Sequence, residues 1–331
     1  MQWTPDTLQH TRAVRRAANA VGLFSVASLC LMWLCQRYLP IGLAQIGLLD
    51  FSESYWGLGR WGYEILSTLL YILSLAPLAL LGAALRRPFP FARKVNRPLN
   101  KRTLLPLLLA GMGICIAANV IANLLYSFLY SFGLETMRDT ITHLSWGDFA
   151  FTLFSSAVLP AILEEMVFRG YMLGLLRPYG QTTALFLTSL LFGMLHGSII
   201  QSPFAFILGL AFGFLALQTG SIWPSVMLHF LNNAYATFQQ YADLFGRSEV
   251  GAMQFSLVLQ MTLLLLGLVA VWFLRTRTDV FAPMPNGPCH TLSANRRAGI
   301  VFSAPVTVLA ILLLLAHMVR TAINTWHWVT V

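Results

Sequence analysis

Charged residues are scarce in this sequence of 331 residues, which is 10% charged and 57% hydrophobic. Soluble domains contain about 25% charged residues, so this composition argues against a soluble globular protein. The apolar content recurs in blocks from residue 17 to residue 319. A cleaved signal peptide at the N-terminus does not account for the later blocks. The composition therefore predicts a polytopic membrane protein.

Cysteines are also few, and their positions exclude two common kinds of site. The four cysteines are scattered along the chain, and three of them lie within apolar runs: Cys30, Cys35, Cys115 and Cys289. They have neither the spacing of a metal site nor that of a disulfide framework. We interpret them as three small buried hydrophobic residues and one thiol in a loop.

The lengths of the apolar blocks predict an all-α fold. A span needs about 20 apolar residues to cross about 30 Å of hydrocarbon. By this measure we expect spans near 17–38, 62–85, 103–132, 149–176, 182–197, 203–217, 222–240, 255–274 and 300–319. The segments between 182 and 240 are short and closely spaced, so one of them could be tilted, broken or re-entrant. We expect eight or nine spans in a single integral membrane domain over 1–331.

Acidic residues are fewer than basic ones, 12 against 21, and the basic residues are unevenly placed. If the N-terminus is cytoplasmic, the inner loops carry Arg86, Arg87, Arg93, Lys94, Arg97, Lys101, Arg102, Arg177, Arg275, Arg277, Arg296 and Arg297. The outer side then has five arginines mixed with acidic residues. This asymmetry predicts a cytoplasmic N-terminus, in a bacterial inner (plasma) membrane. The basic run 86–102 is better explained by topology and contact with anionic lipid than by nucleic-acid binding, so no nucleic-acid partner is expected.

Only three acidic residues lie within apolar segments, namely Glu64, Glu164 and Glu165. An ionisable group inside a span costs about 2.5–3.5 kcal/mol on insertion scales, so each is a functional candidate. Glu64 lies close to the expected end of its span, where a carboxylate is unremarkable. Glu164 and Glu165 are deeper, because Glu164 is about 13 residues, or roughly 20 Å of helix, from Arg177.

Helix geometry gives the two adjacent glutamates different roles. Neighbours on a helix are about 100° apart, so Glu164 and Glu165 point in different directions. Glu165 and Arg169 are four residues apart and can form an ion pair on one face. Glu164 has no such partner in its own helix, which suits a general base or acid.

Two further polar intrusions follow in the next spans. Phe192-Gly-Met-Leu-His196 ends one short span, and His229-Phe-Leu-Asn-Asn233 lies within another, with Asn232 beside Asn233. Lipid offers these side chains no water, so the simplest partners for them are one another and Glu164.

A carboxylate and an imidazole that share a water are the minimal apparatus for hydrolysis. One group takes a proton as water attacks a carbonyl, and the other later protonates the leaving amine. His229 and Asn233 could donate hydrogen bonds to the developing oxyanion. Glu164, His196 and His229 could instead ligate zinc, but the sequence lacks a His-Glu-x-x-His motif. We therefore favour no cofactor, with zinc as the alternative.

The three motifs, in this order on successive spans, resemble the CAAX-protease and bacteriocin-processing (CPBP, or Abi) family. This family includes the eukaryotic type II CAAX prenyl endopeptidase. Here the motifs read Glu164-Glu165-Met-Val-Phe-Arg169, Phe192-Gly-Met-Leu-His196 and His229-Phe-Leu-Asn-Asn233, and they cover about 150–240. The stretch from Gly209 to Pro224 is also similar to the segment that precedes the family's third motif.

The resemblance implies an intramembrane endopeptidase whose catalytic core is formed by four helices near 149–240. It implies that Glu164 and His196 activate water, that His229 and Asn233 form the oxyanion site, and that Glu165 and Arg169 support the first glutamate. Phe192 and Asn232 would be supporting residues. The family has been described both as metal-dependent and as glutamate-type, and we favour the metal-free description because the oxyanion role accounts for Asn233.

The expected partners are the lipid bilayer and a peptide or membrane-protein substrate. Two alternatives remain open from the sequence. One is a proton-coupled transporter, although no repeat relates the two halves of the chain. The other is a non-catalytic immunity or assembly factor with the same fold.

Overall fold

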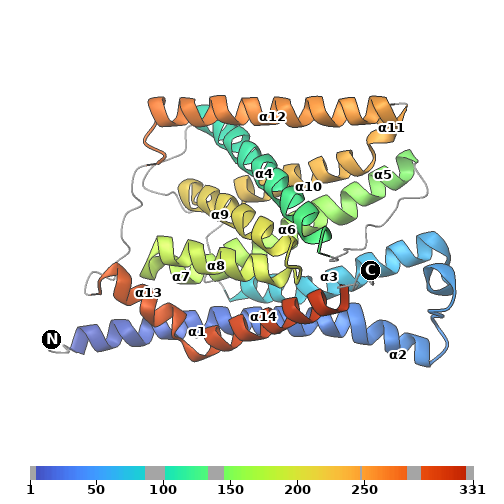
Figure 1. Cartoon of the computed structure of the whole chain (residues 1–331). Helices are drawn as coiled ribbons and strands as arrows, with labels where there is room; N and C mark the ends of the chain where they lie inside the picture. Colours follow the sequence, from blue (N-terminus) through green and yellow to red (C-terminus); the bar gives the residue numbers. More distant parts are fainter. Residues whose placement is uncertain (1–4, 86–100, 133–144, 247, 282–291, 326–331) are drawn as a thin grey trace.

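The computed structural model describes residues 5–85, 101–132, 145–246, 248–281 and 292–325. Helices joined by short connections account for the fold of these residues, which contain no strand (Figure 1). The all-helical fold expected from the sequence is therefore confirmed. In chain order the helices are α1 (Pro5–Trp33), η1 (Leu34–Tyr38), α2 (Leu39–Gln45), η2 (Ser54–Gly57), α3 (Gly59–Ala84), α4 (Lys101–Tyr130), α5 (Trp146–Thr152), η3 (Leu153–Val158), α6 (Leu159–Glu165), η4 (Met166–Leu173), α7 (Gly174–Leu176), η5 (Arg177–Tyr179), α8 (Gln181–Leu195), α9 (Gln201–Thr219), α10 (Trp223–Gln240), α11 (Ala242–Gly246), α12 (Glu249–Arg277), α13 (Ala294–Phe302) and α14 (Pro305–Thr325).

Seven helical stretches of the described residues are long and apolar enough to cross a membrane. They are Thr7–Gln45, Gly59–Ala84, Thr103–Tyr130, Trp146–Tyr179, Gln201–Thr219, Val250–Arg277 and Pro305–Asn324. Two of the nine expected spans fall short for different reasons. Helix α8 has 15 residues, or about 22 Å of helix, and α10 carries the polar His-Asn motif.

The expected span 300–319 is divided in two by a proline. Helix α13 ends at Phe302, and α14 begins at Pro305. Proline lacks a backbone N–H and disfavours helical geometry in the residue before it, so it starts a helix more readily than it continues one. The apolar pattern alone does not reveal this break.

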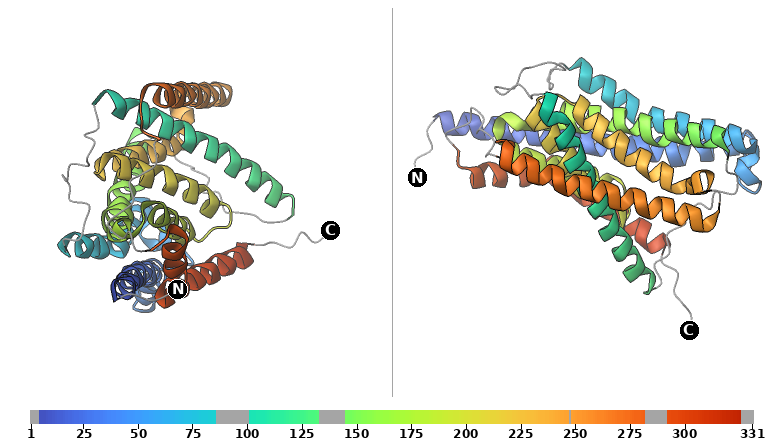
Figure 2. Two further views of the ribbon diagram at one scale, coloured as in Figure 1. Left: turned by 90° about the vertical axis from the view of Figure 1, so that its left-hand side faces the viewer. Right: turned by 90° about the horizontal axis from the view of Figure 1, so that it is seen from above.

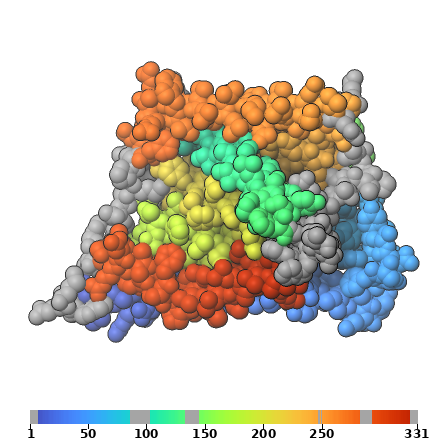
Figure 3. Space-filling model, in the orientation of Figure 1, coloured from blue at the N-terminus to red at the C-terminus, as the bar shows by residue number. Residues whose placement is uncertain are grey.

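Most helices run along one common direction (Figure 1). Helices α12 and α4 pack together on one side and α1 and α14 on the other, with α8, α9 and α10 between them (Figures 1 and 2). Figure 3 shows part of this middle layer exposed between α12 and α14. The motif-bearing helices therefore form the centre of the bundle.

Small residues permit the close helix contacts on which this packing depends. A Cβ atom added at Gly267 of α12 would lie 2.5 Å from Cα of Gly113 in α4. A Cβ added at Gly193 of α8 would lie 2.6 Å from the carbonyl oxygen of Ser202 in α9. Close approach at small residues is a common basis of helix association in membranes. The second contact holds the α8–α9 hairpin tightly closed beside His196.

The N-terminal end of α1, the C-terminal end of α12 and helix α13 lie at the same end of the bundle (Figure 1). These segments contain seven arginines: Arg12, Arg15, Arg16, Arg275, Arg277, Arg296 and Arg297. The clustering agrees with the charge asymmetry of the sequence. That this end faces the cytoplasm remains a prediction.

Candidate active site

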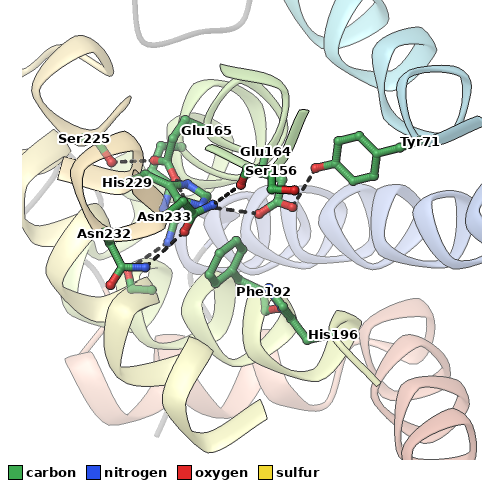
Figure 4. Close-up of polar contacts among 12 residues, drawn as sticks. Tyr71, Ser156, Glu164, Glu165, Phe192, His196, Ser225, His229, Asn232 and Asn233 are labelled. Atoms are coloured by element: carbon green, nitrogen blue, oxygen red, sulfur yellow. Dashed lines mark hydrogen bonds and ion pairs between the residues drawn. The ribbon is translucent and has the colours of Figure 1, made fainter. Parts of the chain in front are cut away.

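The three motifs meet in the middle of the bundle (Figure 4). Glu164 and Glu165 end α6, and Arg169 follows in η4. Phe192 lies in α8, whose C-terminus is capped by His196. His229, Asn232 and Asn233 project from α10.

Glu165 is fully buried and accepts hydrogen bonds from three groups. The Nη1 atom of Arg169 lies 2.6 Å from its Oε1, which confirms the ion pair expected from the four-residue spacing. The Nδ1 atom of His229 lies 3.0 Å from the same oxygen. The hydroxyl of Ser225 donates to Oε2. Glu165 therefore orients His229 directly, and its support of Glu164 stays a prediction.

Arg169 is a buried cation whose partners come from α6, α8 and α9. Its guanidinium pairs with Glu165, and Nη2 donates to the carbonyl oxygen of Gly209 in α9 at 3.1 Å. The ring of Phe192 lies beneath the guanidinium, with 4.4 Å between the ring centroid and Cζ. Phe212 of α9 lies at 5.3 Å by the same measure. These contacts hold η4, α8 and α9 together behind the site.

Glu164 has one bound carboxylate oxygen and one free one. The hydroxyl of Tyr71, from α3, donates to Oε1 at 2.8 Å. The buried Oε2 atom accepts no hydrogen bond from any described residue. The Nε2 atom of His229 is 3.9 Å from Oε2, so the carboxylate and the imidazole are neighbours without a hydrogen bond.

The two histidines are each held through Nδ1. Nδ1 of His196 is 2.9 Å from the carbonyl oxygen of Phe192, which can only accept a hydrogen bond. That tautomer leaves Nε2 of His196 as an acceptor. His229 is fixed in the same way by Glu165, and its ring stacks on Phe212 with 4.7 Å between centroids. Both rings are therefore oriented by contacts that a reaction at Nε2 would not use.

Asn233 is positioned by two side-chain hydrogen bonds. Its Nδ2 donates to the carbonyl oxygen of Ser156, in the π-helical segment η3, at 3.0 Å. The Nδ2 of Asn232 donates to Oδ1 of Asn233, also at 3.0 Å. An amide nitrogen has two N–H donors, so one donor of Asn233 remains for a ligand.

A cavity of about 420 Å³ joins these side chains. Its walls come from α3, the η3–α6 stretch, α8, α9 and α10. The residues lining it are Glu64, Ser67, Thr68, Tyr71, Ser155, Ser156, Pro160, Glu164, Phe192, His196, Gln201, Phe204, Ala205, Leu208, His229, Asn232 and Asn233. Glu164, His196, His229 and Asn233 therefore face one space that can hold water and part of a peptide.

Three contributors were not found by sequence reasoning, namely Tyr71, Ser225 and Glu64. Ser225 precedes His229 by four residues, so helix spacing could have indicated it. Tyr71 carries no such signal, because 93 residues separate it from Glu164. Glu64, which the sequence places close to the expected end of its span, also lines the cavity.

The described residues do not form a recognisable metal centre. No group of three or more His, Cys, Asp or Glu side chains among them is arranged to hold a metal ion. The zinc alternative requires Glu164, His196 and His229 to meet at about 2.0–2.2 Å from one point. Because this set does not converge, we assign no step to a metal.

Residues 146–235 match the family model described as "Type II CAAX prenyl endopeptidase Rce1-like". This segment contains all three motifs. Over this segment, the chain is similar to the CAAX prenyl endopeptidase family. The resemblance drawn from the motifs is thereby confirmed, while the role of each residue is not tested by the match.

The chain is also similar to a protein named "Putative membrane peptidase YdiL" from Bacillus subtilis (strain 168). It is 27% identical over 107 residues, which cover 31% of this chain and 43% of the relative. The chain thus spans less than half of the relative's length. No solved structure matches the chain significantly. Tyr71 and Glu64 lie outside the segment matched by the family model.

Proposed function

We propose that this chain is an intramembrane endopeptidase that hydrolyses a peptide bond of a peptide or membrane-protein substrate in the cavity. The match to the CAAX-protease family and the seven long apolar helices support a protease in a membrane. One observation carries the assignment of the site. Glu164 lines one cavity together with two oriented histidines and an amide donor, and one of its carboxylate oxygens has no hydrogen-bond donor among the described residues.

In the proposed reaction, a water molecule lies between Glu164 and His196. The carboxylate of Glu164 takes a proton from the water as the water oxygen attacks the scissile carbonyl carbon, and Nε2 of His196 accepts the other hydrogen bond. The carbonyl oxygen then carries the negative charge of the tetrahedral intermediate. When the C–N bond breaks, the proton held by Glu164 passes to the leaving amine, which restores the carboxylate.

The oxyanion lies against α10. The remaining N–H of Asn233 and, when it is protonated, the Nε2–H of His229 are the available donors there. Donors fixed before the reaction stabilise developing charge without reorganisation, and removal of one such donor typically costs about 10²–10³ in kcat. Ser156 and Glu165 contribute by fixing Asn233 and His229, respectively.

Tyr71 acts as a positioning residue for Glu164. Its hydroxyl donates to Oε1 at 2.8 Å and so fixes the orientation of the carboxylate. Its contribution comes from α3, so the complete site requires a helix outside the matched family segment.

The position of Glu164 along its helix supports hydrolysis inside the membrane. Glu164 lies in the middle of the helical stretch Trp146–Tyr179, far from both ends of the bundle. With the arginine-rich end in the cytoplasm, the chain lies in the bacterial inner membrane with its N-terminus inside.

The test is proteolysis by purified protein in liposomes, with membrane peptides of the native host as the substrate pool and mass spectrometry as the readout. Wild type is compared with Glu164→Gln and His196→Ala. Glu53→Gln is the matched control, because Glu53 is an exposed carboxylate outside the cavity. We expect cleavage products from wild type and Glu53→Gln, and at least 10³-fold fewer from the other two variants.

Chelators separate the two chemistries described for the family. Cleavage that persists in EDTA and phenanthroline supports the glutamate-type mechanism, whereas loss of cleavage in these chelators supports the zinc alternative. Products that are the same in wild type and Glu164→Gln would contradict the enzyme proposal and favour a non-catalytic partner-binding role.

A further inference from the structure

The charges around the cavity are unbalanced. Two carboxylates line it, Glu64 and Glu164, together with two histidines, and no lysine or arginine does so among the described residues. A carboxylate held away from bulk water is costly unless it is paired or hydrated. The cavity is therefore suited to a ligand that brings positive charge.

Glu64 is the carboxylate that the proposed reaction leaves unused. Its side chain makes no hydrogen bond or ion pair with any described residue, although its backbone carbonyl accepts the hydroxyl of Thr68. Arg60, the described cation one helical turn from Glu64, is already paired, because its Nη2 lies 2.6 Å from Asp148 Oδ1. Glu64 thus offers a free carboxylate to whatever occupies the cavity.

Helix α3 connects Glu64 to the reacting centre. Tyr71 follows Glu64 by seven residues, so the two positions are about 10 Å apart along the helix. Ser67 and Thr68 line the cavity between them and share the same face of the helix. An extended peptide advances about 3.3 Å per residue, so the distance from Glu64 to Tyr71 corresponds to about three residues of a peptide bound along α3.

We infer that Glu64 binds a basic side chain of the substrate about three residues from the scissile bond. The substrate class is accordingly a peptide segment with lysine or arginine at that distance, bound in extended form along α3. The hydroxyl groups of Ser67 and Thr68 lie where they can meet its backbone. This inference rests on the proposed function, since it concerns the specificity of the same site.

The test begins with one peptide whose cleavage depends on Glu164. Internally quenched versions of that peptide carry Lys, Gln or Glu at each position within four residues of the cut. The ratio of kcat/KM for Lys over Gln is measured with wild type, Glu64→Gln and Glu64→Lys, and Glu53→Gln again serves as the control. Ratios within one variant are insensitive to differences in the amount of folded protein.

We expect wild type and Glu53→Gln to prefer Lys over Gln by about ten-fold at one position, two to four residues from the cut. Glu64→Gln should bring this ratio near one, and Glu64→Lys should favour Glu over Lys at the same position. The inference is overturned if Glu64→Lys keeps the wild-type preference, or if wild type shows no charge preference at any position. Absence of any Glu164-dependent cleavage would instead refute the proposed function on which the inference rests.

Discussion

Replacing Arg169 with methionine should destabilise the fold by about 3–5 kcal/mol, because it leaves the carboxylate of Glu165 buried without its cation. The side chain of Arg169 is 1% exposed and that of Glu165 is 0% exposed, so water cannot compensate for the loss. Methionine retains much of the volume and the contacts with aromatic rings. The predicted cost therefore comes from charge and hydrogen bonding rather than from a cavity.

A double variant tests this explanation. In Glu165→Gln/Arg169→Met both charges are removed together, and replacing both members of a buried pair is commonly far less harmful than removing one. We expect the double variant to be more stable than Arg169→Met alone by at least about 1 kcal/mol. It should remain less stable than wild type, because Glu165 also binds Ser225 and His229.

The free energy of unfolding can be measured by SDS titration in mixed micelles, followed by tryptophan fluorescence. Arg37→Met is the matched control, because Arg37 is exposed and makes no ion pair with a described residue. It should change stability by less than about 0.5 kcal/mol. The reasoning fails if Arg169→Met stays within 1 kcal/mol of wild type, or if the double variant is no more stable than Arg169→Met alone.

Two further predictions concern the reaction. Tyr71→Phe should lower kcat by about ten- to hundred-fold with little change in KM, since a hydrogen bond to a charged group contributes about 1.5–3 kcal/mol. Tyr63→Phe is the control and should leave kcat unchanged, because Tyr63 lies outside the cavity. An unchanged kcat for Tyr71→Phe would show that the hydrogen bond to Glu164 is not needed. Asn233→Ala should lower kcat by about 10²–10³ through loss of an oxyanion donor. If kcat instead falls only in proportion to the folded fraction, Asn233 serves the structure through its bond to Ser156 alone.

Much of the site could be predicted because helix geometry acts over a few residues. The pairing of Glu165 with Arg169 and the shared face of His229 and Asn233 both follow from a spacing of four residues. The same rule would have linked Ser225 to His229. It could not identify Tyr71 as the partner of Glu164, because that contact depends on how α3 packs against α6.

The division of the chain into helices could be predicted where hydropathy determines it, and the prediction failed where it does not. Scarcity of charge and recurrent apolar blocks identified a helical membrane protein. The count of long apolar helices fell to seven because α8 is short and α10 is polar. These two helices carry His196 and the His229–Asn233 motif, so the sequence departs from a simple apolar span where the candidate site lies.

By itself, the sequence determined the fold class, the order of the motifs and the local pairing within each helix, since composition and helical period are properties of neighbouring residues. Only the tertiary structure decided that Glu165 holds His229, that Tyr71 leaves one oxygen of Glu164 free, and that Glu64 faces the same cavity. These relations join helices far apart in the chain. They depend on which faces pack together, and a linear pattern of apolar and polar residues does not specify that choice.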